Sequence, residues 1–167
     1  MNDSFILRDR IWREQNERVT LSSNATFASK SLGRYLDEEP DAFRTCFERD
    51  RDRIIHSKTF RRLKHKTQVF INPDGDHFIT RMTHTLNVTQ IGRSIAKTLG
   101  LNPDLTEAIC LGHDVGHSPF GHTGEDVLND MLDGGWSHSE NSVRMLSVIE
   151  PLNLSLIHIS EPTRPNE

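Results

Sequence analysis

The chain has 167 residues, a formal net charge of -4, and 34% hydrophobic and 26% charged residues. This length is enough for one domain with a core, but not for two. The sequence has no apolar run of about 18 residues and no apolar stretch near its start, so we expect neither a membrane-spanning helix nor a secretion signal. Two distant cysteines, Cys46 and Cys110, exclude a disulfide scaffold and indicate a reducing, cytoplasmic compartment.

The first 43 residues are polar, and we expect only a short amphipathic helix in them, near Phe5 to Trp12. Residues 44–66 then carry nine Lys and Arg against three Asp and Glu, a local net charge of +6 in an otherwise acidic chain. Ile55, Thr59 and Leu63 recur every four residues, which predicts one helix with a single apolar stripe.

The clearest helical pattern follows at residues 84–99. Helical spacing separates five residues that would form one stripe: His84, Val88, Ile91, Ile95 and Leu99. Gly100 is a stop signal for this helix. If this stripe is the buried face of the helix, His84 points inward.

Three further helices complete the prediction. Asn102 and Pro103 form a cap and first-turn pair that opens a helix running into His113 and Asp114. Thr123 can cap a helix that ends at Gly134 and Gly135, and residues 137–149 predict a last helix stopped by Pro151. No long alternating strand pattern appears, so the predicted fold class is all-α.

The C-terminal residues have a different character. Residues 154–164 read LSLIHISEPTR, the one-frame translation of a widely used transposase sequencing adapter. We therefore expect the natural sequence to be cut off near Asn153 and leave residues 154–167 out of functional reasoning. The alternative is an ordinary apolar strand with a tail. The expected organisation is a polar segment over 1–43, a partial domain over 44–153 and this artefact over 154–167.

The sequence contains nine histidines, and three of them fall between His113 and His122. A buried His84 can meet the adjacent pair His113 and Asp114, and two imidazoles with a carboxylate suit a divalent ion such as Mn, Fe or Zn, or Mg with several waters. Each residue taken alone is better interpreted as an ordinary core or helix-end residue. The set favours a metal site.

His122 and Glu125, three residues apart, indicate a second kind of chemistry. A carboxylate paired to an imidazole fixes its tautomer and favours its protonated form, which gives a usable general acid or base. A plain helix-capping role for Glu125, with His122 merely exposed, is an equal alternative.

The basic segment 44–66 indicates a negatively charged partner. The alternative is a solvated helix face, which is what runs of charge usually are. Arginine makes bidentate contacts with phosphates, so a polyphosphate is the favoured partner. Nucleic acid is secondary, because the segment lacks interleaved aromatic residues.

Four motifs in this order carry a resemblance over residues 47–154. They are RDRIIHSK (51–58), FRRLKHKTQVF (60–70), TRMTHTL (80–86) and GHDVGHSPFGH (112–122). Together they resemble the HD-domain deoxynucleoside triphosphate triphosphohydrolases of the dGTPase-like type. The resemblance implies an all-α HD-domain helical bundle, here truncated, and a homo-oligomer when the protein has its full length.

The resemblance also implies roles for individual residues. His84, His113 and Asp114 would bind the metal (Mn, Mg or Fe, with Zn less favoured), together with an aspartate that lies downstream in the family and is absent from this chain. His122, supported by Glu125, would be the catalytic histidine, with His117 near the phosphates. Arg81 would hold a phosphate and Gln68 the sugar 3′-hydroxyl.

The implied reaction is attack of water on the α-phosphorus of a dNTP, with dGTP favoured, which releases a deoxynucleoside and triphosphate. We expect this chain alone to be inactive. Two alternatives stay open: another HD-type phosphohydrolase, acting on a nucleoside monophosphate or a cyclic nucleotide, and a non-catalytic nucleotide- or single-strand-binding module.

Overall fold

The computed structural model describes residues 8–66 and 80–155, and these residues contain seven α-helices and no strand. The all-α prediction is therefore confirmed. The helices are α1 (Arg10–Thr20), α2 (Cys46–His56), α3 (Lys58–Arg62), α4 (Arg81–Thr98), α5 (Pro103–Gly112), α6 (Gly121–Met131) and α7 (His138–Arg144). No helix in the described part of the chain is long and apolar enough to cross a membrane.

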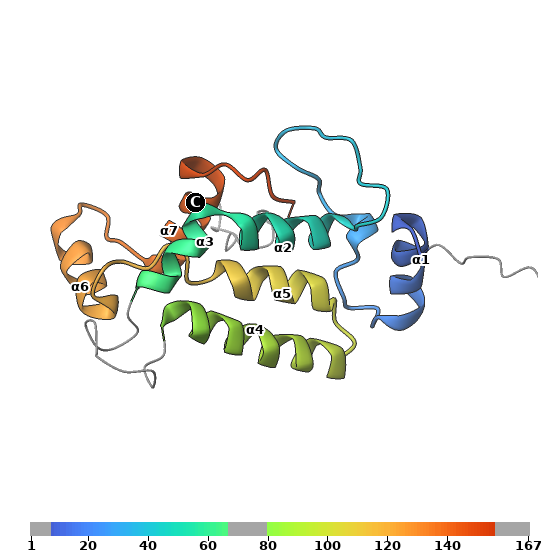
Figure 1. Cartoon of the computed structure of the whole chain (residues 1–167), viewed down its shortest axis with the longest axis horizontal. Helices are drawn as coiled ribbons and strands as arrows, with labels where there is room; N and C mark the ends of the chain where they lie inside the picture. The colour runs from blue at the N-terminus through green and yellow to red at the C-terminus, as the bar shows by residue number, and fades with distance from the viewer. Residues whose placement is uncertain (1–7, 67–79, 156–167) are drawn as a thin grey trace, which may run out of the picture.

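Helices α2, α5 and α4 lie side by side, with α5 in the middle, and form the body of the molecule (Figure 1). The core lies between α2 and α5. Its members are buried apolar side chains of α2, α5 and the segments that follow them: Phe47, Ile54, Leu63, Ala108, Leu111 and Val115. At one end of this body lies α1, and at the other lie α6 and α7 (Figure 1).

Helix α5 begins as the sequence predicts. The Asn102 side chain accepts hydrogen bonds from the backbone N–H groups of Asp104 and Leu105, and Pro103 occupies the first turn. Gly100, with φ of +67°, makes the tight turn from α4 into this cap. The packed helix then ends at Gly112, which places His113 and Asp114 directly after the core.

Helix α4 is present as predicted, but its buried face is different. Ile91, Ile95 and Leu99 are 61%, 54% and 60% exposed. The face that packs consists of small or short side chains, Thr85, Thr89, Gly92 and Ala96. A β-carbon on Gly92 would lie 2.8 Å from the Cys110 sulfur. Helices α4 and α5 thus approach each other closely through small residues. Because this face of α4 packs on α5, the apolar stripe of α4 faces outward.

The basic segment is not a single helix. Ser57, with φ of -67° and ψ of 153°, interrupts it and caps α3 by accepting a hydrogen bond from the Phe60 N–H. The Glu150 carboxylate accepts hydrogen bonds from the first backbone N–H groups of α3, those of Lys58 and Thr59, at 2.8 Å each. A distant acid therefore stabilises a helix start that the local pattern does not indicate.

Two other predicted helix starts are shifted. Helix α1 begins at Arg10, where the Asp9 side chain accepts a hydrogen bond from the Trp12 N–H. Of the predicted 5–12 helix, residues 5–7 lie outside the described residues. Helix α6 begins at Gly121 rather than after Thr123, and Phe120 before it adopts a left-handed backbone with φ of 66°. The predicted last helix is confirmed: Ser137 caps α7, which continues as a π-helical turn over Met145–Ile149.

Candidate active site

Two groups of His, Asp and Glu side chains lie near the start of α4, the end of α5 and helices α6 and α7. These parts of the backbone are at the same end of the molecule (Figure 1). The loop over residues 113–120 connects α5 to α6 and carries much of this site. Two glycines allow the loop to pack closely. A β-carbon on Gly116 would lie 2.2 Å from the Ser142 nitrogen, and one on Gly124 would lie 2.0 Å from the Pro119 carbonyl oxygen. Any larger side chain at either position would push the loop away from α6 or α7.

The first cluster consists of His84, His113 and Asp114. Each offers one ligand atom, and these atoms lie within 4.8 Å of one another. The Nδ1 of His113 lies 2.6 Å from the Cys110 carbonyl oxygen. A carbonyl only accepts hydrogen bonds, so Nδ1 carries the proton and Nε2 of the neutral ring offers its lone pair. Two imidazoles and a buried carboxylate fit a divalent cation.

Arg81 provides a positive charge at this cluster. Its Nη1 donates a hydrogen bond to Asp114 Oδ2 at 2.9 Å, and both residues are buried. Burial alone would raise the pKa of Asp114, but the hydrogen bond and charge of Arg81, together with the charges of His113 and His117, outweigh burial and lower it. Asp114 is therefore a carboxylate at neutral pH.

Lys66 provides a second positive charge nearby. Its ammonium donates hydrogen bonds to the carbonyl oxygens of Val115 at 3.1 Å and His117 at 2.8 Å. Burial, together with the neighbouring charge of Arg81, lowers the pKa of Lys66. Two cations beside one carboxylate leave an excess positive charge, which suits an anionic ligand.

The second cluster consists of His117, His122, Glu125 and His138, again with one ligand atom from each within 4.8 Å of the others. Glu125 is its centre. It accepts hydrogen bonds from the His122 Nδ1 at 3.2 Å and from the backbone N–H and Nδ1 of His138 at 2.9 Å. The ring of His138 stacks on His117 with centroids 4.6 Å apart, and the ring of His122 meets His117 edge-on at 5.2 Å.

Two pKa shifts describe this cluster. Burial raises the pKa of Glu125, but the hydrogen bonds from His138 and His122 outweigh burial and lower it to about 2. Burial, with the charge of Arg81, lowers the pKa of His117 to about 4. At neutral pH Glu125 is thus ionised and His117 neutral, so His117 acts there as a hydrogen-bonding group rather than as a charge.

The structure brings the predicted residues together in two groups, His84, His113 and Asp114 in one and His117, His122 and Glu125 in the other. Gln68 lies outside the described residues. Sequence reasoning missed His138, which contacts Glu125 across 13 residues and the turn at Gly134 and Gly135. A signal was present, because His138 directly follows Ser137, the predicted start of the last helix.

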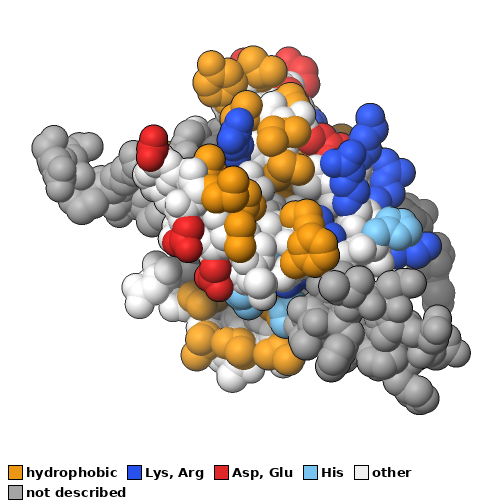
Figure 2. Space-filling model, turned by 90° about the vertical axis from the view of Figure 1, so that its left-hand side faces the viewer, with side chains coloured by type: hydrophobic (Ala, Val, Ile, Leu, Met, Phe, Trp, Pro, Cys, Tyr) orange, Lys and Arg blue, Asp and Glu red, His pale blue; other side chains and the backbone are white. Residues whose placement is uncertain are grey.

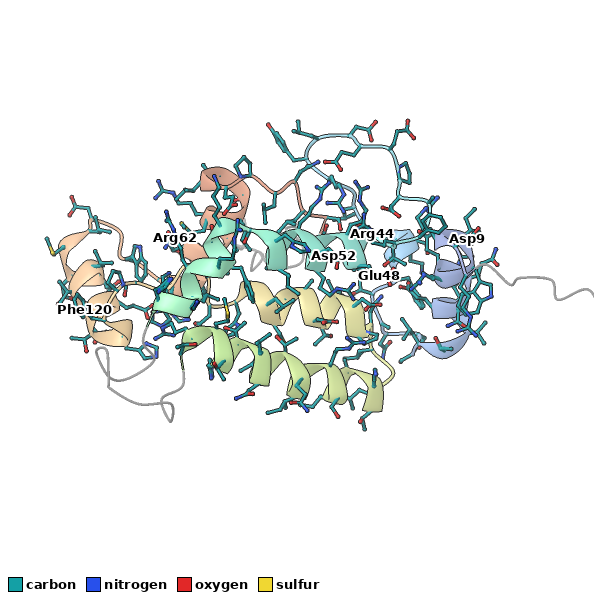
Figure 3. The ribbon with its side chains drawn as sticks, in the orientation of Figure 1. Asp9, Arg44, Glu48, Asp52, Arg62 and Phe120 are labelled. Atoms are coloured by element: carbon teal, nitrogen blue, oxygen red, sulfur yellow. The ribbon has the colours of Figure 1, made fainter. Side chains whose placement is uncertain are left out.

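The basic segment divides into two halves. The arginines of its first half form ion pairs with acids: Arg44 with Asp41 and Asp52, Arg49 and Arg53 with Glu38, and Arg51 with Asp52 and Asp104. Arg61, Arg62 and Lys64 of the second half are exposed and form no ion pair with any described residue. Figure 3 labels Arg62 and Phe120 at the histidine end of the molecule, away from Arg44 and Asp52. The half of the basic segment without these ion pairs therefore lies at the same end of the molecule as the two histidine clusters.

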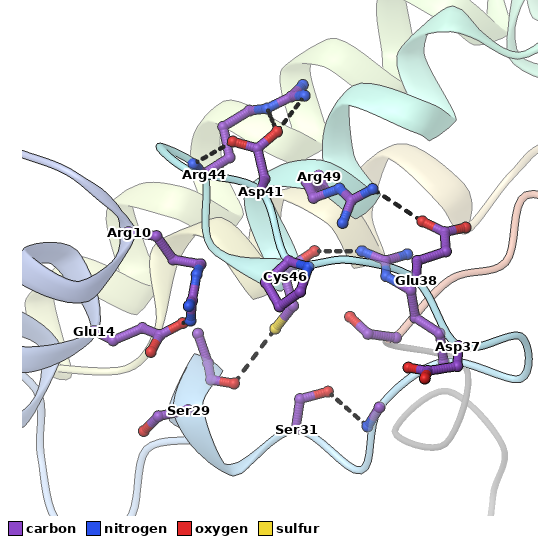
Figure 4. Close-up of a pocket in the computed structure, with 15 residues that line it drawn as sticks. Arg10, Glu14, Ser29, Ser31, Asp37, Glu38, Asp41, Arg44, Cys46 and Arg49 are labelled. Carbon is purple, nitrogen blue, oxygen red and sulfur yellow. Dashed lines mark hydrogen bonds and ion pairs between the residues drawn. The ribbon is translucent and has the colours of Figure 1, made fainter.

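Figure 2 faces the α6 end and shows apolar side chains across it, with Lys, Arg and His side chains beside them. A separate hollow of about 290 Å³ lies between α1, the loop at residues 28–41 and α2 (Figure 4). Its arginines form ion pairs with nearby acids, as in the pairs of Arg10 with Glu14, Arg34 with Asp50 and Arg44 with Asp41. This hollow has no free charge to bind an anion.

Comparison with known proteins agrees with this geometry. The HD domain model matches residues 81–161. The chain is 61% identical over 137 residues to a deoxyguanosinetriphosphate triphosphohydrolase-like protein of Caldanaerobacter subterraneus subsp. tengcongensis, a match that covers 82% of this chain and 40% of that protein. Proteins of the same name from Clostridium perfringens and Syntrophus aciditrophicus are 58% and 51% identical, over 86% and 84% of this chain and 42% and 36% of their own length.

The chain thus spans about two fifths of the length of the curated relatives that it matches. The matched domain begins at Arg81 and includes all the described residues of both clusters. By these matches the chain contains an HD domain over residues 81–161 and is similar, over more than four fifths of its own length, to deoxyguanosinetriphosphate triphosphohydrolase-like proteins.

Proposed function

We propose that the whole protein is a metal-dependent phosphohydrolase that converts a dNTP, preferentially dGTP, into a deoxynucleoside and triphosphate. The names of the relatives supply the substrate class. One observation carries the proposal on the side of chemistry: two of the three candidate metal ligands, His113 and Asp114, and an imidazole–carboxylate pair lie on the same short stretch of chain, between His113 and Glu125. Hydrolysis of a phosphate ester needs both, one for the phosphate charge and one for the proton.

His84, His113 and Asp114 would hold the cation, with Mn, Mg or Fe favoured by the mixed nitrogen and oxygen donors. When bound, such an ion neutralises negative charge on phosphate oxygens. The resemblance adds an aspartate from beyond the matched region as a further ligand. Arg81 and Lys66 supply positive charge on the same side, which would favour a polyphosphate over a neutral substrate.

His122 would act as the proton donor or acceptor. Its ring is hydrogen-bonded to Glu125, which fixes the tautomer, while its side chain is 78% exposed and therefore within reach of a ligand. Water would attack the α-phosphorus, and the departing 5′-oxygen would take a proton. Neutral His117, buried beside His122, would donate or accept a hydrogen bond at the phosphate without adding charge.

The test is a product assay of the full-length gene product with Mn²⁺ and each dNTP in turn. Equal amounts of deoxynucleoside and tripolyphosphate are expected, fastest with dGTP. His122→Gln should reduce the rate by roughly 10²–10⁴-fold, whereas His56→Gln, a change at an exposed histidine of α2, should not. Release of orthophosphate or a nucleoside monophosphate would select the other HD-type hydrolases. Nucleotide binding without turnover would select a binding module.

The 167-residue chain alone should bind metal weakly and show negligible turnover. It supplies three ligands to the first cluster, and it spans only two fifths of its relatives. Turnover of dGTP by this chain at ordinary enzymatic rates would contradict that expectation while leaving the proposed reaction intact.

A further inference from the structure

We infer that Lys66 is a positioning residue, which fixes the backbone of the first half of the α5–α6 loop, residues 113–117. This half carries His113, Asp114 and His117, and residues 114–117 are buried. Buried backbone groups need hydrogen-bond partners, so the donors that reach the carbonyl oxygens of the loop determine its shape. Two sources supply these donors, helix α7 and Lys66.

Helix α7 holds the loop at His113 and Gly116. The Ser142 hydroxyl lies within hydrogen-bonding distance of the His113 carbonyl oxygen, at 2.8 Å, and accepts a hydrogen bond from the Gly116 N–H at 2.9 Å. The Asn141 side-chain amide donates to the Gly116 carbonyl oxygen at 2.6 Å. These bonds leave the carbonyls of two other residues of the loop to a different donor.

Lys66 holds these two carbonyls, which belong to Val115 and His117. Its ammonium group donates to both, at 3.1 Å and 2.8 Å. Lys66 is half-buried and forms no ion pair with a carboxylate of the described residues, so main-chain carbonyls are the partners of its charge. Hydrogen bonds from a charged donor are stronger than those between neutral groups. One side chain thus fixes the loop at two positions that bracket Gly116.

The backbone of Lys66 is itself held on both sides. Its N–H donates to the carbonyl oxygen of Leu63, a fully buried residue of the core, at 3.3 Å. Its carbonyl oxygen accepts a hydrogen bond from the N–H of Arg81, the first residue of α4, at 3.1 Å. Lys66 therefore joins the core, the start of α4 and the loop. It sets the first turn of α4, which carries His84, relative to the loop.

This role differs from an action of the Lys66 charge on a ligand. If Lys66 acts by position, its loss should loosen the loop while α5 stays folded, and Asp114 and His117 should lose their fixed placement. The expected effect on the reaction rate rests on the proposed function, whereas the expected effect on the loop does not.

The first test is amide hydrogen exchange of the 167-residue chain, followed by NMR. Lys66→Met keeps the length of the side chain and removes its donors. The amides of Gly116 and His117, which donate hydrogen bonds within the site, should then exchange about tenfold faster or more. The amide of Leu111, in the buried part of α5, should keep its protection.

Two further variants serve as controls for this measurement. Lys66→Arg keeps a charged donor and should retain most of the protection of the loop. Lys97→Met makes the same chemical change at an exposed lysine near the end of α4, and it should leave the exchange of the loop unchanged.

The second test uses steady-state kinetics of the full-length protein with dGTP. Lys66→Met should lower kcat by about 10–100-fold with a smaller change in KM, because displaced groups slow the reaction. Lys66→Arg should recover most of this loss. A rise in KM with unchanged kcat and an unchanged loop would mean that Lys66 acts through its charge on the substrate, and would overturn the inference.

The exchange measurement separates this inference from the proposed function. Equal exchange at Gly116 and His117 in wild type and Lys66→Met would refute the positioning role, whatever the protein hydrolyses. Faster exchange at Leu111 to the same degree would also refute it, because Lys66 would then stabilise the whole fold. Faster exchange confined to the loop supports it even if the full-length wild type hydrolyses no dNTP, in which case only the proposed function fails.

Discussion

Arg81 and Asp114 form an ion pair at 2.9 Å in which both side chains are only 6% exposed. The first residue of α4 is thereby joined to the second residue after the end of α5, next to His113. The carboxylate in this pair is also one of the three atoms that would hold the cation. Arg81 and a bound metal ion would therefore both interact with the Asp114 carboxylate, so the ion pair and metal binding affect each other.

Replacing Arg81 tests this relationship. Arg81→Gln leaves Asp114 buried without its partner, which should destabilise the metal-free chain by about 3–5 kcal/mol. A divalent cation restores the missing charge, so Mn²⁺ should raise the Tm of Arg81→Gln more than that of the wild type. Thermal unfolding with and without Mn²⁺ measures both effects, and Arg18→Gln at an exposed site of α1 is the control. Equal Mn²⁺-induced shifts in all three proteins would contradict the competition.

Glu125 is the acceptor shared by His122 and His138, so its replacement should affect the proposed reaction through their positions. In Glu125→Gln the ionised carboxylate is lost while the size of the side chain is kept. We expect kcat of the full-length protein to fall by about 10–100-fold, with KM changed by less than a few-fold, because the substrate charge is held elsewhere. Steady-state kinetics with dGTP measures the two constants. A large rise in KM with unchanged kcat would indicate that Glu125 acts in binding instead.

Glu38 makes a pH-dependent contribution to stability. Its carboxylate accepts hydrogen bonds from Arg53 and Asn153, and these bonds lower its pKa from 4.5 to about 2. A depressed folded-state pKa gives stability that is fully present above pH 4.5 and is lost as the pH falls towards 2. The free energy of unfolding of the wild type should therefore exceed that of Glu38→Gln at pH 6, and the difference should shrink steadily below pH 4.5. Urea unfolding over this range is the measurement, and a constant difference would refute the assignment.

The parts of the fold that were predicted correctly depend on local chemistry. The Asn102 cap with Pro103, and the Ser137 cap of α7, act within three residues of the helix start. The start of α3 depends instead on Glu150, 91 residues from Thr59, and no local pattern contains it. The helix predicted through Ser57 is for that reason two helices in the structure.

The same distinction holds at the site. His113 and Asp114 are adjacent in sequence, and His122 and Glu125 are three residues apart, so their grouping was visible. The contact between Glu125 and His138 requires the chain to turn back after α6, and the Arg81–Asp114 pair spans 33 residues. His84 reaches His113 although α4 does not bury its apolar stripe, because the first turn of α4 faces the end of α5. The prediction for His84 thus rested on the wrong helix face.

The orientation of α4 can itself be tested with two neighbouring residues. If the apolar stripe were buried, Ile95→Lys would place a charge in the core and strongly destabilise the chain. In the structure Ile95 is largely exposed, so this change should alter the free energy of unfolding by no more than about 0.5 kcal/mol. Ala96, one residue later, is buried in the close contact with α5, and Ala96→Leu should cost about 1–3 kcal/mol through overpacking. Urea unfolding of both variants in the 167-residue chain decides the question, and the reverse order of effects would mean that α4 is rotated from the orientation described.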